Sequence, residues 1–378
     1  MTVSMPLRRI LFVCRGSTCD GLGHVMRSRS VAREMSRLAA VQMLVIGDSY
    51  VESLLKGWGL RYRIEPDESA FARTLDEFKP DVIVLDALTA GDEMIRLARA
   101  RDTMLVSLSP VFDQLSRMDL VFHRTRYQGD DWKFEEGSSP ELRCSLDYAV
   151  VRDNCVRISD AEFEENLSQD RLAIAVSMGG ADAGNKTLQM LRALSIVQRP
   201  LLIWTLLGEG YAHSYESLVE CVRQTTQHEI ILAKTSDSMW RVLRTCCLAV
   251  LAGGTITYEA AFAGLPSINL FENPRNVFLI NELVDQGVCL SAGHPMEDAV
   301  DVAAANVAQF NTNRQVLRRM HESARGLIDG KAGRRISEEI LDSYWVRHFS
   351  RNSRPALAAD DGNPEDRAGT GVGEDRAA

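Results

Sequence analysis

The stretch Leu248–Leu270, LAVLAGGTITYEAAFAGLPSINL, predicts a buried strand, a glycine turn, a helix and a second strand. Its first five residues are apolar without a polar break, which is typical of a strand covered on both faces of a parallel sheet. Gly253 and Gly254 then allow backbone to approach a ligand closely, because they carry no Cβ atom. The stretch therefore predicts a βαβ unit that either serves packing alone or binds a ligand at its turn.

Two side chains that follow this turn would suit a nucleotide. Thr255 is placed to cap the helix, whose unpaired N–H groups and partial positive charge favour a phosphate. Glu259 follows about one turn later on the same side of the helix. Its carboxylate could accept two hydrogen bonds from a ribose diol. An ordinary βαβ unit with a glycine turn accounts for the same residues. The choice between it and a nucleotide-binding turn depends on motifs elsewhere in the chain.

Composition limits the class of protein. The chain has 378 residues, of which 45% are hydrophobic and 25% are charged, as in globular proteins of two domains. The net charge of -9 disfavours nucleic acid as a partner. No apolar run approaches the ~20 residues of a membrane span, and the N-terminus lacks the pattern of a signal peptide. We therefore expect a cytoplasmic protein with no integral membrane segment, whose oligomeric state the sequence leaves open.

No cofactor or metal is predicted. The eight cysteines show no CxxC spacing, and we interpret them as reduced residues, mostly in the core. Neither an HExxH motif nor a carboxylate cluster with metal-ligand spacing occurs in the sequence.

Strand and helix patterns alternate along both halves of the chain. Up to about residue 150 the alternation predicts a doubly wound parallel sheet. The acidic segment Ser159–Asp170 is interpreted as an interdomain linker, after which the alternation resumes. We expect three regions: an N-terminal Rossmann-like domain in 1–158, a C-terminal Rossmann-like domain in 159–348, and a disordered tail in 349–378.

The motif GLGHVMR, Gly21–Arg27, follows the first predicted strand. Gly21 and Gly23 precede a helix that begins near His24. A helix N-terminus disfavours imidazolium, so a neutral His24 could act as a general base toward water or a hydroxyl. Arg27, one turn later, could pair with a phosphate or be solvated. A helix-start histidine without a catalytic role is the alternative interpretation.

Two further motifs also follow predicted strands. In SMGGADAGNKT, Ser177–Thr187, the turn at Gly179 and Gly180 could converge with the turn at Gly253 on one diphosphate. The alternative is a tight turn with Asn185 as an N-cap. In LFENPRN, Asn273 could hold a sugar hydroxyl, a water or a phosphate, or could simply start a helix before a proline.

The set GLGHVMR, DYAVVR, SMGGADAGN and AGGTITYEAAFAGLPSINLFEN, in this order, resembles the PseG/SpsG family. These are GT-B-fold, MurG-like proteins related to glycosyltransferases. The pseudaminic-acid member is a UDP-2,4-diacetamido-2,4,6-trideoxy-β-L-altropyranose hydrolase. The resemblance covers roughly residues 8–345. It implies a catalytic role for His24, an active-site role for Asn273, and a UDP site formed by the glycine-rich loops and Glu259.

Two positions depart from this family. Arg15–Cys19 stands where the hydrolase has an acidic stretch of Ser-Asp-Ser type. Leu88 stands where the hydrolase has an aromatic residue. In the family both positions touch the sugar, so the resemblance does not identify the sugar.

The sequence thus predicts a GT-B fold, with UDP on the C-terminal domain and His24 supplied by the N-terminal domain. The favoured function is a metal-independent UDP-sugar hydrolase, in which His24 deprotonates water for attack on the anomeric carbon with inversion. Helix N-termini at Gly180–Asn185 and Thr255 would stabilise the leaving diphosphate. The implied pathway is the biosynthesis of sialic-acid-like sugars of the pseudaminic type, or of surface polysaccharides. A glycosyltransferase that uses a UDP-sugar donor is the alternative, and a non-catalytic nucleotide-sugar-binding protein is a third possibility.

Overall fold

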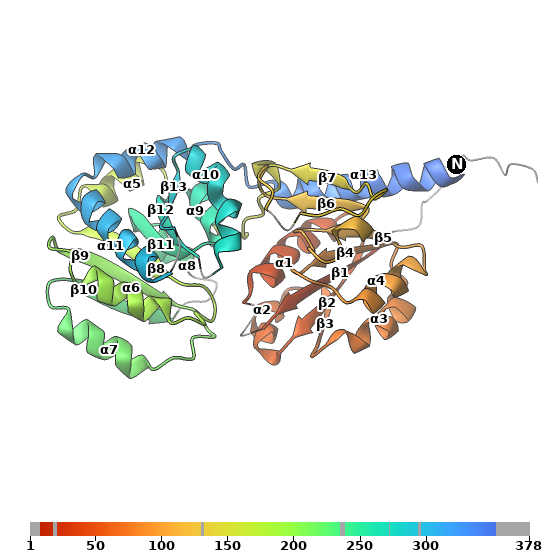
Figure 1. Cartoon of the computed structure of the whole chain (residues 1–378), viewed down its shortest axis with the longest axis horizontal. Helices are drawn as coiled ribbons and strands as arrows, with labels where there is room; N and C mark the ends of the chain where they lie inside the picture. Colours follow the sequence, from red (N-terminus) through yellow and green to blue (C-terminus); the bar gives the residue numbers. More distant parts are fainter. Residues whose placement is uncertain are drawn as a thin grey trace, which may run out of the picture.

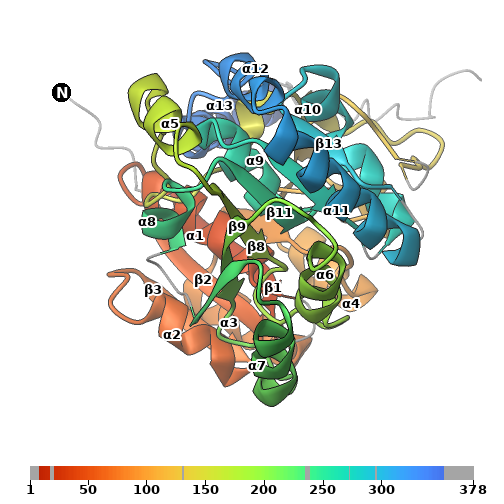
Figure 2. The ribbon, with the colours of Figure 1, turned by 90° about the vertical axis from the view of Figure 1, so that its left-hand side faces the viewer.

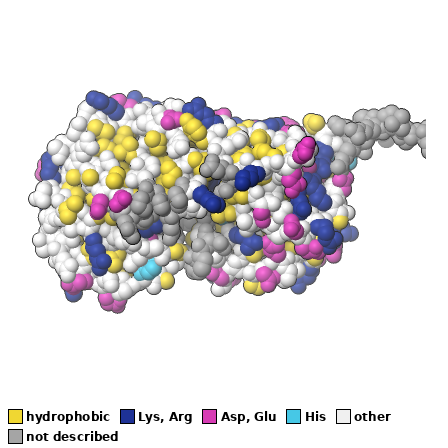
Figure 3. All heavy atoms as spheres, viewed as in Figure 1, with side chains coloured by type: hydrophobic (Ala, Val, Ile, Leu, Met, Phe, Trp, Pro, Cys, Tyr) yellow, Lys and Arg dark blue, Asp and Glu magenta, His cyan; other side chains and the backbone are white. Residues whose placement is uncertain are grey.

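Two parallel β-sheets, one in each half of the chain, organise the structure (Figure 1). The computed structural model describes residues 8–17, 21–129, 132–234, 239–271, 273–293 and 296–352. Figure 2, viewed from the C-terminal half, places one sheet in front of the other. On the face seen in Figure 3, acidic and basic side chains are interspersed over the N-terminal half.

Within these residues the N-terminal sheet has seven parallel strands in the order β3-β2-β1-β4-β5-β6-β7. The strands are β1 (Arg9–Gly16), β2 (Ala40–Gly47), β3 (Arg61–Glu65), β4 (Val82–Asp86), β5 (Met104–Ser107), β6 (Leu120–His123) and β7 (Glu141–Cys144). The connecting helices are α1 (Gly23–Met35), α2 (Glu52–Leu55), α3 (Phe71–Phe78) and α4 (Asp92–Arg99), with 3-10 segments η1 (Ser49–Val51), η2 (Glu68–Ala70), η3 (Leu115–Arg117) and η4 (Leu146–Tyr148). The strand order reverses between β1 and β4, which is where open α/β sheets bind ligands.

The C-terminal sheet repeats this plan with the order β10-β9-β8-β11-β12-β13, again parallel. Its strands are β8 (Leu172–Ser177), β9 (Leu201–Leu207), β10 (Glu229–Lys234), β11 (Leu248–Ala252), β12 (Ser267–Leu270) and β13 (Cys289–Ser291). Its helices are α5 (Asp160–Leu167), α6 (Lys186–Leu194), α7 (Tyr215–Gln224), α8 (Met239–Leu243), α9 (Thr255–Ala263), α10 (Asn281–Asp285), α11 (Met296–Thr312) and α12 (Gln315–Ser323), with the 3-10 segment η5 (Pro274–Ile280) before α10. The reversal falls between β8 and β11.

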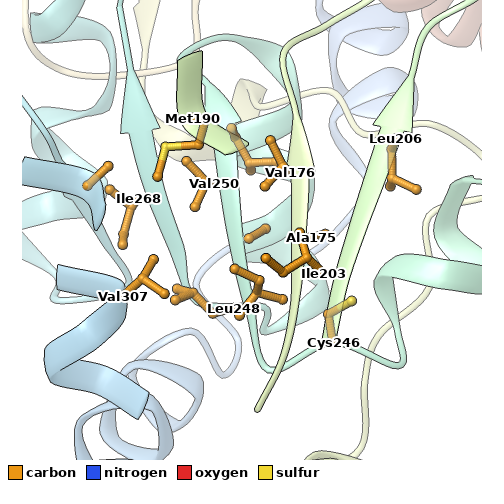
Figure 4. Close-up of a cluster of buried hydrophobic side chains, with 14 of the residues drawn as sticks. Ala175, Val176, Met190, Ile203, Leu206, Cys246, Leu248, Val250, Ile268 and Val307 are labelled. Carbon is orange, nitrogen blue, oxygen red and sulfur yellow. The ribbon is translucent and has the colours of Figure 1, made fainter. Parts of the chain in front are cut away.

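The apolar runs of the central strands account for this core. All of β8 and most of β11 are buried, as expected for parallel strands that helices cover on both faces. Figure 4 shows side chains of β8, β9, β11 and β12 that meet Met190 of α6 and Val307 of α11. The predicted pair of doubly wound sheets is therefore confirmed.

Three local predictions were wrong. The segment predicted as an interdomain linker is largely α5, because Ser159 and Glu162 form a capping box and Phe163 and Leu167 are buried. The connection between the halves therefore lies just before it, at 149–159. The edge strand β7 (Glu141–Cys144) was not predicted, because its flanking residues are polar. The chain also remains helical to residue 352, beyond the predicted start of the tail at 349, and 353–378 lie outside the described residues.

The last helix, α13 (Ala332–Asn352), returns to the N-terminal half (Figure 1). Its residues Ala332, Ile336 and Ile340 belong to the core that α1 and the N-terminal sheet share. Ser337 Oγ also reaches the Val31 carbonyl of α1 at 3.4 Å. The prediction assigned this helix to the C-terminal domain, because an amphipathic pattern shows that one face is buried without showing against which neighbour.

Among the described residues, no helix combines the length and the apolar character that a membrane crossing requires. The seven cysteines in these residues are free thiols, and most of them are buried.

The docking of α13 can be tested with one substitution. Ile336→Ala should destabilise the protein by about 2–4 kcal/mol, because it removes a side chain that is only 1% exposed and leaves a cavity. Val346→Ala on the same helix is the control, since that side chain is 63% exposed. Urea denaturation monitored by circular dichroism measures both variants. Equal stability of the two would show that α13 does not dock through Ile336.

Candidate active site

A cavity of about 280 Å³ lies between the halves, at the carboxyl ends of the central strands. The N-terminal half contributes the start of α1 to its wall, and the C-terminal half contributes the loops after β8, β9 and β11. The starts of α1 and α9 face each other closely: a Cβ atom built on Gly23 would lie 3.5 Å from Thr255 Oγ1. The lining residues are Gly21, Leu22, Gly23, Met26, Arg152, Ser177, Gly179, Gly180, Leu206, Gly208, Glu209, Met239, Ala252, Gly253, Gly254, Thr255, Ile256 and Glu259.

Close backbone packing requires glycine at two points of the C-terminal wall. A Cβ atom on Gly208 would lie 2.2 Å from the Gly180 carbonyl oxygen, so the loops after β8 and β9 touch through their backbones. A Cβ atom on Gly253 would lie 2.0 Å from the ring of Phe271. These two glycines therefore serve the packing of the wall itself. A Cβ atom on Gly254 would meet only the Ala252 carbonyl oxygen, at 3.9 Å, so the backbone at Gly254 can be approached by a ligand.

His24 lies at the start of α1 and contacts a buried carboxylate. Its Nδ1 atom is 2.7 Å from Asp86 Oδ1, at the carboxyl end of β4. Arg27 Nε donates to Asp86 Oδ2 at 2.9 Å, and Arg27 Nη2 also contacts Asp86 Oδ1. Ser28 and Ser109 hydroxyls complete the set of donors, at 3.2 and 3.1 Å. Strands β4 and β5 and helix α1 are therefore joined at one carboxylate.

The charge state of Asp86 follows from these contacts. Burial by itself would raise the pKa of the Asp86 carboxyl, but Arg27 and His24 hold that pKa well below its usual range. Arg27 Nη2 also lies 3.1 Å from His24 Nδ1, but the shorter contact of Nδ1 is with Asp86 Oδ1. An ionised carboxylate can only accept, so we assign the proton of the His24–Asp86 hydrogen bond to Nδ1. The Nε2 atom of a neutral His24 is then the unprotonated nitrogen. The His24 side chain is 18% exposed, whereas Asp86 is fully buried.

Arg27 was predicted to bind substrate, and the structure places it differently. Its side chain is 6% exposed, and its Nε and Nη2 atoms face Asp86. A guanidinium held in this way positions the carboxylate and does not extend into the cavity. Sequence spacing indicates that Arg27 lies on the same helix face as His24. It does not indicate whether Arg27 pairs with Asp86 or with a phosphate, because that depends on the fold.

The two predicted phosphate-binding helix starts in the C-terminal half are not equivalent. At α6 the Asp182 carboxylate accepts from the N–H groups of Lys186 and Thr187, at 2.8 and 3.0 Å. Asn185 occupies the N-cap position in the left-handed region, and its Oδ1 accepts from the Tyr211 hydroxyl at 3.0 Å. A buried carboxylate therefore already accepts from the first two N–H groups of α6, where the sequence analysis expected a diphosphate.

The start of α9 differs in its cap. Gly254 occupies the N-cap position, and Thr255 is the first helical residue, so Thr255 is not the cap that was predicted. Thr257 Oγ1 accepts from Gly254 N at 3.4 Å and donates to Asn269 at 2.7 Å. Gly253, Gly254 and Thr255 all line the cavity. The N-terminus of α9 therefore points its partial positive charge at this space.

Glu259 lines the cavity one turn further along α9, as predicted, and is paired with Arg152. Arg152 Nε lies 2.8 and 2.9 Å from the two carboxylate oxygens, and Nη2 lies 2.6 Å from Oε2. The Glu259 side chain is 1% exposed.

Asn273 is exposed and starts η5, where its side chain accepts from Arg275 N at 3.0 Å. This is the helix-start alternative that the sequence left open. Asn273 and Asn185 are both outside the cavity lining.

The structure thus gathers eight of the predicted site residues around one cavity, and His24 follows the lining residue Gly23 without being part of the lining itself. The eight are Gly21, Gly23, Gly179, Gly180, Gly253, Gly254, Thr255 and Glu259. Sequence reasoning missed Asp86, Asp182 and Arg152. The sequence did contain a signal for Asp86. It ends the apolar strand β4, which pairs with β1, the strand before His24. A carboxylate at the end of a buried strand needs a charged or hydrogen-bonding partner.

Solved structures with this arrangement decide the fold. MurG from Acinetobacter baumannii superimposes with a TM-score of 0.63 at 16% identity, covering 89% of this chain and 99% of that one. Anabaena HepE in complex with UDP and glucose gives 0.62 at 13% identity, covering 89% and 100%. This chain has the GT-B fold. The cavity therefore occupies the cleft between the two Rossmann-like domains of a GT-B protein.

Curated proteins add a resemblance in sequence. The spore coat polysaccharide biosynthesis protein SpsG of Bacillus subtilis is 21% identical over 332 residues, which cover 86% of this chain and 95% of SpsG. An uncharacterized protein of Methanocaldococcus jannaschii is 22% identical over 272 residues, or 70% of this chain. That match spans only 56% of the archaeal protein. No family model matches the chain. The GT-B chain thus resembles SpsG along most of its length, as its motifs predicted.

Replacement of Asp86 tests the buried cluster. Asp86→Asn should cost about 3–5 kcal/mol near neutral pH, because it leaves the Arg27 guanidinium buried without its counter-ion. The folded state lowers the pKa of Asp86, so the native protein binds this proton less tightly than the unfolded chain does. The stability that Asp86 contributes should be complete above the unfolded pKa of about 3.9 and should be lost as the pH falls through the lower folded pKa.

Urea denaturation of wild type and Asp86→Asn from pH 7 down to pH 2 measures this difference, which should start to shrink below about pH 3.9. Glu93→Gln is the control, because Glu93 pairs with Arg96 on the exposed face of α4, and its free energy of unfolding near neutral pH should match that of wild type. A stability difference that does not shrink in acid would show that the Asp86 charge is not what the cluster depends on.

Proposed function

We propose that this GT-B protein is a UDP-sugar hydrolase that cleaves the bond between the anomeric carbon and the diphosphate. The observation that carries the proposal is the hydrogen bond between His24 Nδ1 and the buried Asp86 carboxylate, at the edge of a cavity whose opposite wall is a glycine-rich helix start. The carboxylate orients a base, and the helix start receives a negatively charged leaving group.

The C-terminal wall is the proposed nucleotide site. The diphosphate would lie against the N-terminus of α9, where Gly254, which has open space at its Cβ position, would allow the diphosphate oxygens to approach the backbone. Glu259 would accept hydrogen bonds from the ribose hydroxyls. Asp182 caps α6, so we assign the diphosphate to α9 alone. The names of solved GT-B neighbours support a UDP ligand, since HepE was solved with UDP and glucose.

The reaction follows from this placement. His24 Nε2 accepts a proton from water while the water oxygen forms a bond to the anomeric carbon. The bond from that carbon to the diphosphate oxygen breaks, and its electron pair leaves with UDP. Attack on the face opposite the leaving group inverts the anomeric centre. The dipole of α9 stabilises the charge that grows on the diphosphate, and the Asp86 carboxylate stabilises the imidazolium that forms.

A glycosyltransferase is the second candidate. It needs the same donor and base, with an acceptor hydroxyl in place of water. Leu88 favours it: this side chain follows β4 two residues after Asp86 and is 53% exposed, which would suit an apolar acceptor. The biosynthetic role implied by the name of SpsG, spore coat polysaccharide biosynthesis, accommodates either reaction. A role in the pseudaminic-acid type of pathway belongs to the same proposal.

Release of UDP from a panel of UDP-sugars separates the two. A hydrolase releases UDP without an added acceptor, and in ¹⁸O-labelled water the label enters the sugar and not UDP when the product is analysed at once by mass spectrometry. A transferase releases UDP only when an acceptor hydroxyl is present. Binding of UDP without turnover on any substrate would contradict both reactions and leave a binding protein.

His24→Asn tests the proposed base. This change should lower kcat by about 10²–10⁴-fold, because it removes the group that accepts the proton from water. The affinity for UDP should be nearly unchanged, since the proposed nucleotide site lies on the other domain. In the wild type, kcat should fall as the pH is lowered, because a protonated imidazole cannot accept a proton.

His348→Asn is the matched control, because it makes the same chemical change on the exposed side of α13. We expect it to retain full kcat. Both variants are measured for kcat, UDP affinity and melting temperature on the same preparations. Full turnover in folded His24→Asn would contradict the proposed mechanism, whereas lost stability with normal turnover of the folded fraction would assign His24 a capping role.

A further inference from the structure

The connection between the two domains lies along α9, the helix that starts at the cavity. Cys155 Sγ reaches the Glu259 carbonyl at 3.5 Å, and Ile158 N donates to the Ala263 carbonyl at 2.9 Å. Arg157 Nη1 contacts the Phe262 carbonyl at 3.3 Å. The connection thus satisfies carbonyls near the C-terminus of α9, where a positive charge is also favourable. Arg152 begins this row of contacts on the side of the cavity.

The Arg152 guanidinium approaches Glu259 from one side. Its Nε and Nη2 atoms are the two donors, at 2.6–2.9 Å from the carboxylate oxygens. A carboxylate offers about four acceptor sites, so two N–H groups leave roughly two of them. Both Glu259 and Arg152 line the cavity, so these remaining sites are next to the ligand space. Two acceptor sites on one carboxylate match the two neighbouring hydroxyls of a ribose.

Arg152 also provides Glu259 with the partner that a buried carboxylate requires. The Glu259 side chain is 1% exposed, and a buried charge without a partner is costly. The planar fork of arginine satisfies the carboxylate at two points and fixes its plane, which a lysine cannot do.

We propose that Arg152 is a positioning residue that holds the Glu259 carboxylate correctly oriented for the ribose diol, and that it thereby sets the preference of the site for ribonucleotides. The inference rests on the proposed function, because it takes Glu259 to be the ribose contact. Arg152 does not need to touch the nucleotide for this role. Its removal should therefore affect the recognition of the two hydroxyls and leave the recognition of the diphosphate in place.

Two ligands separate these contributions: UDP, and 2′,3′-dideoxyuridine 5′-diphosphate, which lacks both hydroxyls. Calorimetry should show that the wild type binds UDP about 10- to 100-fold more tightly than the dideoxy ligand, the scale of hydrogen bonds to a charged group. In Arg152→Ala the affinity for UDP should fall until the ratio approaches one, while the affinity for the dideoxy ligand stays nearly constant. Arg152→Lys keeps the charge and loses the fork, and it should lose part of the ratio.

Arg157→Ala is the matched control, because it lies on the same connection and contacts α9 away from Glu259. Its ratio should equal that of wild type. A folded Arg152→Ala that keeps the wild-type ratio, or that weakens both ligands equally, would overturn the inference. If Arg152→Ala does not fold, an undiminished ratio in Arg152→Lys overturns it instead. Wild-type protein that binds UDP without discrimination would refute the inference alone, and wild-type protein that does not bind UDP would refute the proposed function with it.

Discussion

The N-terminal side of the active site depends on one buried carboxylate. Asp86 ends β4 at the point where the strand order of the sheet reverses, and it is fully buried. Such a charge is tolerated only while donors surround it, and α1 supplies three of them from consecutive turns: His24, Arg27 and Ser28. The same contacts that stabilise the charge therefore dock α1 on the sheet and orient the imidazole at the cavity. The contacts of Asp86 therefore contribute both to the stability of the fold and to the placement of the proposed base.

The C-terminal side uses backbone where the N-terminal side uses side chains. Its loops pack so closely that glycine is required at Gly208 and Gly253, and the start of α9 adds N–H groups and a helix dipole to polar side chains such as Glu259. Asp182 caps one of the two neighbouring helix starts, which is why we propose α9 as the site of a diphosphate. The chain between the domains is hydrogen-bonded along the same helix. A ligand at the start of α9 would therefore lie on the helix to which the interdomain connection is hydrogen-bonded.

Sequence patterns predicted the two sheets and most of the cavity wall, because both depend on local features. Apolar runs such as Leu248–Ala252 can only be covered strands, and glycines after such strands fall at one edge of a parallel sheet. The pairings of Arg27 and Arg152 were missed because their partners are distant in the sequence. Arg27 and Asp86 are 59 residues apart, and Arg152 and Glu259 are 107 apart. The spacing of an arginine along its own helix or loop does not reveal whether it binds a carboxylate of the protein or a phosphate of a ligand. The return of α13 to the N-terminal domain was hidden for the same reason.

The central claim is that Asp86 holds His24 as the tautomer with its proton on Nδ1, so that Nε2 can accept a proton. Long-range ¹H–¹⁵N NMR spectra of protein labelled in its histidine side chains report the tautomer directly, and His24→Asn identifies the signal by its loss. We expect a protonated Nδ1 and an unprotonated Nε2 for His24 at a pH where the ring is neutral, and a mixture of tautomers in Asp86→Asn. A proton on Nε2 in the wild type would contradict the proposed role of His24 as a base, because the imidazole would then present a donor to the proposed water.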